Sequence, residues 1–296
     1  MIGLGRVGSI TAYSLAQKEL ASEVVLIDNK HEKLISESLD ISHSLSNKQT
    51  LIRAGNYSDI SDSSVIIITA GIGRKAGETR DDLLLKNASI MKDIIFNIKP
   101  YYKDNIVIVV ANPVDVMANL VSHLLKAKRE KIIGSGTLLD TARLKYELSD
   151  CLNIAQKEIE CLVIGEHGNN CLILWNSIEV AHKPINQIPN LDRDNIIQNV
   201  HKSGNEIIKG KGFTCYGIAA EICNLVENLK KDSHTILPLS IGLEGEYDIN
   251  DVFLSLPCLI TSSGVEKVIT PEISEQELGL LKASAEKLKN YLKKVF

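Results

Sequence analysis

The chain opens with the G-x-G-x-x-G stretch Gly3-Leu4-Gly5-Arg6-Val7-Gly8, whose last two residues begin a predicted helix over residues 7–20. In such a stretch the first glycine permits a tight turn, and the second lets backbone N–H groups approach a pyrophosphate. The third allows the helix to pack closely on a sheet, and the helix N-terminus favours the phosphate charge. Taken alone the stretch is a weak indicator, so the residues that follow it decide the interpretation.

An acidic residue ends the next predicted strand, Glu23-Val24-Val25-Leu26-Ile27-Asp28, twenty residues after Gly8. At that spacing its carboxylate can accept both hydroxyls of a ribose, and its charge repels a 2′-phosphate. We therefore expect the cofactor to be NAD rather than NADP. The cofactor-binding residues predicted from this pattern are Gly3, Gly5, Val7, Gly8 and Asp28. Only two residues precede the glycines, so we expect either a start further upstream or a shortened central strand.

The first half of the chain alternates short, nearly continuous apolar runs with longer helical stretches. The predicted strands cover residues 24–28, 65–69, 106–111 and 131–134, and the predicted helices cover 7–20, 31–45, 80–102 and 114–129. Parallel strands that are buried on both faces have continuous apolar runs of this kind. Their alternation with helices predicts right-handed crossovers and an α/β fold with a doubly wound, parallel Rossmann sheet.

The second half predicts a different, α+β arrangement. Helices are predicted over 139–151, 191–209, 217–231 and 274–294, and strands of antiparallel character over 160–164, 171–175, 235–242 and 252–261. We therefore predict an NAD-binding Rossmann domain at 1–135 and a substrate-binding, catalytic α+β domain at 136–296. No Gly/Ser-rich linker separates them, so we expect a cleft between two closely joined lobes.

Composition argues against several classes of function. The 296 residues are 44% hydrophobic, enough for a large core, and a net charge of −4 with 4% aromatic residues argues against a nucleic-acid or anionic-membrane partner. No apolar run approaches the ~20 residues of a membrane span, and no basic-then-apolar leader is visible. The six cysteines have neither C-x-x-C nor zinc-finger spacing. We expect reduced thiols, no metal and a cytoplasmic location.

Four polar segments carry groups suited to carbonyl reduction: 69–80, 111–115, 136–143 and 164–169. His167 can donate the proton, and Asp140 can hold one ring nitrogen and raise the imidazolium pKa. Arg143, three residues on along the same predicted helix, suits a two-point grip on a carboxylate. Arg80 can polarise the carbonyl oxygen, and Asn112 can donate to the same oxygen or contact the cofactor. Each residue alone is as readily a turn residue or a surface charge, but together with the glycine stretch they predict a dehydrogenase.

These motifs, together with Lys211-Gly212-Phe213-Thr214-Cys215-Tyr216-Gly217-Ile218-Ala219, resemble those of the L-lactate/malate dehydrogenase family over nearly the full chain. The resemblance implies reversible hydride transfer between NADH and a small 2-oxo acid, in a homodimer or homotetramer. It implies His167 as acid/base, Asp140 as its partner and Arg143 as the carboxylate clamp. Arg80 becomes the polarising arginine on a closing loop that contains Gly73 and Gly77. The other residues that it implies, at the active site or near the cofactor, are Asn112, Tyr57, Gly71 and Ser135.

The resemblance leaves two substrates open. Malate enzymes have an arginine six residues before the polarising arginine, where lactate enzymes have glutamine, and here that residue is Arg74. A buried guanidinium needs a second carboxylate as its partner, so Arg74 favours oxaloacetate and malate as the substrate pair. The alternative is L-lactate dehydrogenase, because Gly77-Glu78-Thr79-Arg80 and the pocket residues Thr214 and Ile218 resemble lactate enzymes.

Three other functions are weighed against this interpretation. An NAD-dependent glycosidase would need a metal held by cysteine and histidine, for which Cys161 and His167 are poor candidates. A non-catalytic NAD-binding protein is favoured only by the short first strand, and Arg74 disfavours a dehydrogenase for bulkier, branched acids.

Lys145 and Glu160 stand where lactate enzymes activated by fructose 1,6-bisphosphate have arginine and histidine. Because an acid facing a phosphate is unfavourable, we predict no such activation.

Overall fold

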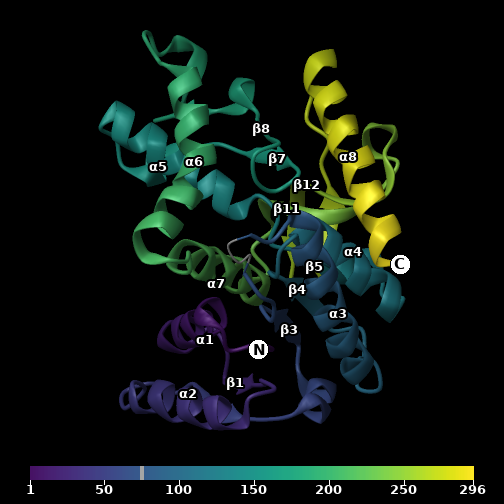
Figure 1. Cartoon of the computed structure of the whole chain (residues 1–296). Coiled ribbons are helices and arrows are strands. Elements are labelled where there is room, and N and C mark those ends of the chain that lie inside the picture. The colour runs from purple at the N-terminus through teal and green to yellow at the C-terminus, as the bar shows by residue number, and fades with distance from the viewer. Residues whose placement is uncertain (74–76) are drawn as a thin grey trace.

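A computed structural model describes residues 1–73 and 77–296 of the chain (Figure 1). Its first half contains five strands that pair in parallel: β1 (Glu23–Leu26), β2 (Leu51–Ala54), β3 (Val65–Ile68), β4 (Ile106–Val109) and β5 (Ile132–Gly134). Ile2 forms parallel bridges with both Ile27 and Ile68, and so occupies the place between β1 and β3. The resulting order of parallel strands is β2-β1-Ile2-β3-β4-β5. The chain adds β1 and β2 on one side of Ile2 and β3, β4 and β5 on the other, so the strand order reverses at Ile2. Doubly wound sheets bind their ligands at such a reversal, and the glycine stretch begins at the next residue.

The parallel Rossmann sheet predicted from the sequence is confirmed, and one unpredicted strand joins it. β2 lies at the edge of the sheet, where it pairs with β1, and its Leu51 side chain is 65% exposed. The segment therefore lacks the continuous apolar run that marks a buried strand. In the interior strand β4, by contrast, every residue is buried, as its apolar run Ile106–Val109 predicts.

Four helices accompany these strands: α1 (Arg6–Gln17), α2 (His31–His43), α3 (Arg80–Ile98) and α4 (Val114–Leu125). α1 buries Gly8, Thr11, Ala12 and Leu15, a helical spacing of small and apolar residues that lets it lie close to its neighbours. α3 begins at Arg80 because Thr79 caps it. The Thr79 hydroxyl accepts the backbone N–H of Asp82 (3.1 Å), and the Asp82 carboxylate accepts that of Thr79 (3.0 Å).

The second half has the α+β character that its sequence predicts. Its helices are α5 (Leu138–Leu152), α6 (Arg193–Lys211), α7 (Tyr216–Lys231) and α8 (Glu275–Val295). Its strands are β6 (Ile159–Glu160), β7 (Val163–Gly165), β8 (Cys171–Ile173), β9 (Glu179–Val180), β10 (Lys183–Pro184), β11 (Thr235–Glu244), β12 (Asn250–Thr261) and β13 (Gly264–Val268). The long antiparallel pair β11–β12 is its centre, with β13 and β7 on β12.

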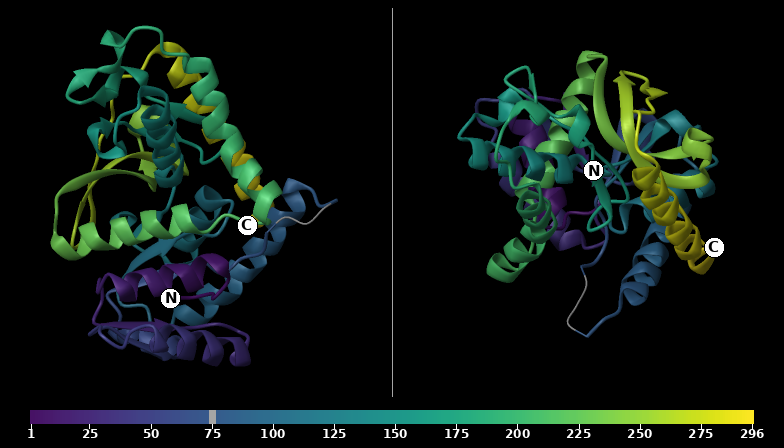
Figure 2. Two further views of the ribbon diagram at one scale, coloured as in Figure 1. Left: turned by 90° about the vertical axis from the view of Figure 1, so that its left-hand side faces the viewer. Right: turned by 90° about the horizontal axis from the view of Figure 1, so that it is seen from above.

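One sheet runs through both halves. β11 pairs antiparallel with β5 through Ser240 and Gly134, so the order continues as β3-β4-β5-β11-β12-β7-β8. A Cβ at Gly134 would lie 2.7 Å from the Ser240 Cβ, so only glycine allows the two strands to meet there. The sheet therefore crosses position 135, where the sequence predicts the domain boundary. α1 of the first half also packs against α7 of the second, as the left view of Figure 2 shows.

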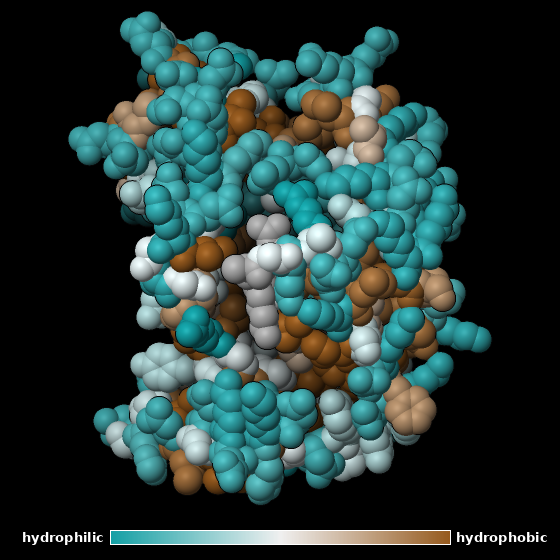
Figure 3. Space-filling view, in the orientation of Figure 1, coloured by the Kyte–Doolittle hydropathy of each residue, from teal (hydrophilic) through white to brown (hydrophobic). Residues whose placement is uncertain are grey.

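The core follows this division in part. A large apolar cluster joins the parallel strands to β11, β12, α7 and α8, and a smaller one lies beneath α5 and α6, around Leu144, Ile159 and Val200. In the space-filling view the face of Figure 1 is hollowed near its middle, with apolar side chains inside the hollow (Figure 3). Among the described residues, no helix is both long and apolar enough to cross a bilayer.

Candidate active site

A cavity of about 590 Å³ lies beside the glycine stretch, at the reversal of the parallel sheet. Its walls come from the carboxyl ends of β1 and β3, from the short 3-10 helix Tyr57–Asp62 and from α3. Of the predicted cofactor-binding residues, those that line it are Gly3, Gly5, Asp28, Tyr57 and Gly71. The remaining ones, Val7, Gly8, Asn112 and Ser135, lie outside this lining. The cavity has the place and the residues of a dinucleotide site.

The three glycines of the opening stretch play different parts. A Cβ at Gly3 would lie 2.5 Å from the backbone of Ala70, and φ there is +92°. A Cβ at Gly8 would lie 1.9 Å from the Gly3 carbonyl oxygen. A Cβ at Gly5, by contrast, would meet no atom of the described residues within 4 Å. Gly3 and Gly8 thus close the turn against β3, while Gly5 leaves its backbone open to the cavity, as a pyrophosphate requires.

Asp28 stands at the end of β1 and is held by two backbone donors. The N–H of Leu4 donates to its Oδ2 (2.7 Å), and the N–H of Lys30 donates to its Oδ1 (2.9 Å). These bonds place an anionic acceptor against the glycine turn, where the ribose of a dinucleotide would lie. Burial and the charge of Asp28 raise the pKa of Tyr57, so this phenol stays neutral beside the carboxylate. The residues present fit NAD.

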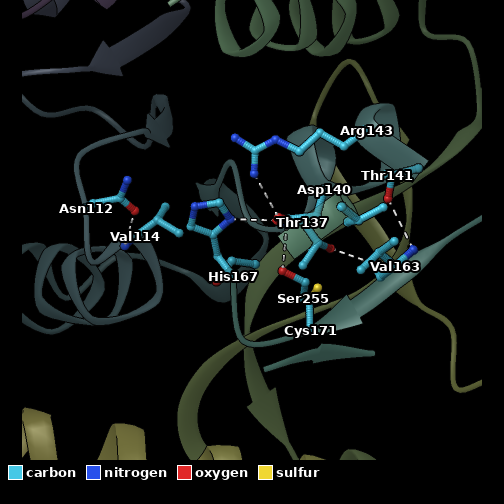
Figure 4. A network of polar contacts seen from close by, with 12 residues as sticks. Asn112, Val114, Thr137, Asp140, Thr141, Arg143, Val163, His167, Cys171 and Ser255 are labelled. Atoms are coloured by element: carbon cyan, nitrogen blue, oxygen red, sulfur yellow. Dashed lines mark hydrogen bonds and ion pairs between the residues drawn. The ribbon is translucent and has the colours of Figure 1, made fainter. Parts of the chain in front are cut away.

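The second centre of the site is a pair formed by the partly exposed His167 and the buried Asp140 (Figure 4). Asp140 lies in the first turn of α5 with its side chain 3% exposed, and His167 lies in the loop between β7 and β8, 24% exposed. The His167 Nδ1 lies 2.6 Å from the Asp140 Oδ2. With Nδ1 held in this way, Nε2 is the ring nitrogen that can exchange a proton with a substrate.

The pair holds the proton on the imidazole. Burial works to lower the pKa of His167, but the charge and the hydrogen bond of Asp140 outweigh it, and the pKa is raised above 6.5. Burial likewise works to raise the pKa of Asp140, but the charge and hydrogen bond of His167, with the charge of Arg143, outweigh it, and the pKa is lowered. The arrangement supplies a proton donor near neutral pH next to a fixed carboxylate.

Arg143 shares the same carboxylate from one turn further along α5. Its Nη1 lies 3.4 Å from the Asp140 Oδ1, a weak contact, and its side chain is 17% exposed. A Cβ at Gly204 of α6 would lie 3.0 Å from the Arg143 Nη2, so α6 packs closely over the guanidinium. Within the described part of the chain Asp140 takes one weak contact from the guanidinium, whose planar fork suits a two-point grip on a carboxylate.

The backbone of Asn112, just before α4, is held by Asn87. Asn87 is 2% exposed on α3, and its amide donates to the carbonyl oxygens of Asn112 (2.7 Å) and Ile72 (3.1 Å). The Asn112 Oδ1 accepts the N–H of Val114 at the start of α4 (3.3 Å). Figure 4 shows His167 with Asn112 on one side and Asp140 with Arg143 on the other.

The remaining predicted residues are less closely tied to this cluster. Arg80 is the first residue of α3 and is exposed, and Gly77 before it has φ +84°. Thr214 and Ile218, both partly buried, lie where α7 begins. Arg74 lies outside the described residues.

Sequence reasoning assigned no role to several polar residues that the fold brings to the site. Asn87 and Asp115 are both buried, and His201 of α6 has its Nε2 3.6 Å from the Cys171 Sγ, near Asp140. A polar residue within an otherwise apolar helix face could have marked Asn87, and an acidic residue two positions after Pro113 could have marked Asp115. Among the described residues, no group of three His, Cys, Asp or Glu side chains is arranged to hold a metal.

Together the doubly wound sheet, the glycine turn, Asp28 and the His167–Asp140 pair define a dinucleotide-dependent enzyme. Residues 1–134 match the family model described as lactate/malate dehydrogenase, NAD binding domain, and residues 137–296 match its alpha/beta C-terminal domain. The chain is 40% identical to "L-lactate dehydrogenase 2" of Clostridium acetobutylicum, over 99% of this chain and 95% of that protein.

Solved structures agree with this match. A lactate dehydrogenase from a Medee basin deep-sea metagenome library superposes with a TM-score of 0.95 at 34% identity, over 99% of this chain and 97% of that one. The minor L-lactate dehydrogenase of Enterococcus mundtii, in its ligands-bound form, gives a TM-score of 0.95 at 30% identity, over 100% of this chain and 97% of that one. The chain belongs to the lactate/malate dehydrogenase family. It is an NAD-dependent oxidoreductase that acts on the CH–OH group of a small 2-hydroxy acid.

Proposed function

We propose that the enzyme interconverts pyruvate and L-lactate. The observation that carries the proposal is that relatives of 38% and 40% identity, matched over 99% of the chain, are named L-lactate dehydrogenases. The stretch from Gly77 to Arg80, with Thr214 and Ile218, supports the same choice by resemblance. Oxaloacetate and malate are the second candidate pair, and Arg74 is the residue that favours them.

In the proposed reaction His167 is the acid/base. As the 2-oxo acid is reduced, its Nε2 donates a proton to the carbonyl oxygen, and in the reverse direction it takes the proton back. Asp140 keeps Nδ1 occupied and stabilises the imidazolium. NADH, when bound, supplies the hydride to the carbonyl carbon.

The substrate is held by two arginines and an amide. Arg143 binds the substrate carboxylate with the donors that Asp140 leaves free. Arg80 polarises the carbonyl oxygen, and Asn112 donates to the same oxygen. Thr214 contributes to the wall of the substrate pocket, while Arg74 would bind a second carboxylate if the substrate were oxaloacetate.

The dinucleotide is bound by the first half of the chain. Asp28 accepts the ribose hydroxyls, and the backbone between Gly3 and Gly8, with Val7 in the first turn of α1, holds the pyrophosphate. The other residues assigned to the cofactor are Tyr57, Gly71, Asn112 and Ser135. The division into domains at 1–135 and 136–296, a homodimer or homotetramer and a cytoplasmic location stay predictions.

The test is steady-state NADH oxidation with pyruvate and with oxaloacetate, in the wild type and in Arg74→Gln, with the exposed Arg53→Gln as a control for loss of a surface charge. We expect pyruvate to have the higher kcat/KM in the wild type and to keep it in both variants. If oxaloacetate is preferred and Arg74→Gln alone shifts the preference to pyruvate, Arg74 faces the substrate and malate replaces lactate as the product. If neither acid is reduced, the proposed function is wrong.

A further inference from the structure

A second carboxylate, that of Asp115, contacts His167 at its backbone, whereas Asp140 contacts its imidazole. Asp115 is the second residue of α4 and is only 3% exposed. Its Oδ2 accepts the backbone N–H of His167 (3.1 Å), and its Oδ1 accepts the Ser240 hydroxyl (2.6 Å). One carboxylate therefore connects three elements: α4, the loop between β7 and β8, and β11.

The cost of burying this carboxylate indicates that its contacts serve a purpose. A buried anion is unfavourable unless donors compensate it, and two donors with the N-terminus of α4 do so in part. Burial raises the pKa of Asp115 to about 6, against the hydrogen bonds from Ser240 and His167, and the neighbouring charge of Glu166 raises it further. Glu166 is itself paired with Lys287 (2.7 Å).

We propose that Asp115 is a positioning residue, which fixes the backbone of the His167 loop so that the imidazole stays between Asp140 and the substrate. Asp115 is 3% exposed and both of its carboxylate oxygens are bonded within the protein, so it acts through His167. The inference rests on the proposed role of His167 as acid/base. Asp140 holds the imidazole at Nδ1, and Asp115 holds the same residue at its backbone N–H.

The loop needs such an anchor because glycines flank it. Gly165 and Gly168 have φ of +88° and +104°, and a Cβ at Gly168 would meet no atom of the described residues within 4 Å. Gly165 is held in β7 by its pairing with Ser255 and Cys171, so the conformational freedom of the His167 loop lies on the Gly168 side. An imidazole displaced by about 1 Å can cost about a hundredfold in rate, so one buried hydrogen bond at the loop centre has a large effect on turnover.

Charge is the second contribution of Asp115. Its carboxylate raises the pKa of His167, in addition to the larger effect of Asp140. Two substitutions separate the contributions. Asp115→Asn keeps an oxygen for the His167 N–H, and the Ser240 hydroxyl can turn to accept from the new amide, so only the charge is lost. Asp115→Ala removes both the charge and the anchor.

The test compares Asp115→Asn, Asp115→Ala and Ser240→Ala with the wild type. The matched control is Asp194→Ala, since Asp194 is likewise the second residue of its helix, α6, but is exposed. We expect Asp115→Ala to lower kcat about a hundredfold with the Kd for NADH unchanged, and Asp115→Asn to restore most of kcat. Ser240→Ala should lower kcat less than Asp115→Ala, and Asp194→Ala should leave it unchanged.

A measurement independent of turnover completes the test. The imidazole of His167 is titrated by NMR, with its signal identified by its loss in His167→Gln, and we expect a lower pKa in Asp115→Asn than in the wild type. If Asp115→Ala keeps wild-type kcat, or if Asp115→Asn loses as much kcat as Asp115→Ala, the positioning role is overturned. An unchanged His167 pKa in Asp115→Asn overturns the charge contribution. If Asp115→Ala does not fold, Asp115→Asn and Ser240→Ala decide. The NMR titration of His167 can be carried out even if the wild type reduces neither acid. Failure of the proposed function can therefore be distinguished from failure of this proposal.

Discussion

The dinucleotide cavity is shaped by backbone, whereas the cluster around His167 is shaped by buried side chains. At the cavity, Gly3 and Gly8 leave no room for a Cβ, and Asp28 is oriented by two backbone N–H groups. At the cluster, Asp140 binds the imidazole, and Asp115 binds the backbone behind it. A site formed by backbone is disrupted when a substitution adds atoms and moves the backbone. A site formed by paired charges is disrupted when one partner loses its charge. The two regions should therefore fail in different ways when they are altered.

The largest effect is expected at His167. Loss of a positioned acid/base typically costs about 10²–10⁴ in rate, so His167→Gln should lower kcat/KM for pyruvate by that factor. The Kd for NADH, measured by fluorescence titration, should not change, because the cavity contains no atom of His167. The exposed His43→Gln is the control. A loss of NADH affinity equal to the loss of rate would contradict the separation of the two regions.

Gly8→Ala should have the opposite effect to His167→Gln, because it should weaken NADH binding rather than the acid/base step. The new methyl would lie 1.9 Å from the Gly3 carbonyl oxygen, so α1 must shift away from the turn. Overpacking of this kind costs about 1–3 kcal/mol in unfolding free energy, and NADH affinity should fall with it. Gly279→Ala, on α8 with open space around it, should instead raise stability slightly. Unchanged NADH binding in a stable Gly8→Ala protein would show that close approach at Gly8 is not required.

The pH dependence of the reaction should separate the regions further. The folded pKa of His167 lies above 6.5, so the proton donor stays charged above that pH, and pyruvate reduction should fall only as pH rises through the folded pKa. The stability that the His167 charge contributes is complete below 6.5 and is lost over the same rise. Asp140→Asn removes the largest influence that raises this pKa, so the alkaline fall should begin at lower pH. The profile of kcat/KM against pH measures this, and an unmoved profile would count against the pair.

The smallest effect is expected at Asp28. Its charge repels a 2′-phosphate, and one such repulsion at about 4 Å in water is worth roughly 1 kcal/mol. Asp28→Asn should therefore reduce the preference for NADH over NADPH about fivefold, measured as the ratio of kcat/KM for the two cofactors. The Asn side chain still has an oxygen for the Leu4 N–H, so the turn should be kept. A ratio that stays at the wild-type value would mean that the charge of Asp28 does not discriminate between NADH and NADPH, and that Asp28 only holds the glycine turn.

Much of the fold could be predicted because its signals are local. The apolar runs that became β3, β4 and β5 and the capped start of α3 can be recognised within a few residues. The edge strand β2 was missed because exposed positions interrupt its pattern, and the pairing of β5 with β11 depends on residues far apart in the chain. In the same way, side-chain chemistry and spacing mark His167, Asp140 and Arg143 in the sequence, whereas neither assigns a role to Asp115 or Asn87. Their importance depends on burial and on partners from other elements.

The sequence by itself determined the doubly wound half, the glycine turn with Asp28, and the chemical types gathered at 140, 143 and 167. These follow from the period of apolar residues, from the space that glycine alone permits and from side-chain chemistry, all of which act over short stretches of chain. Only the tertiary structure decided that one sheet passes through both halves and that two carboxylates from different helices meet His167. Long-range pairing and burial depend on how distant segments pack. The sequence shows that a residue is acidic, but only the packed structure shows that its carboxylate is removed from water and needs partners.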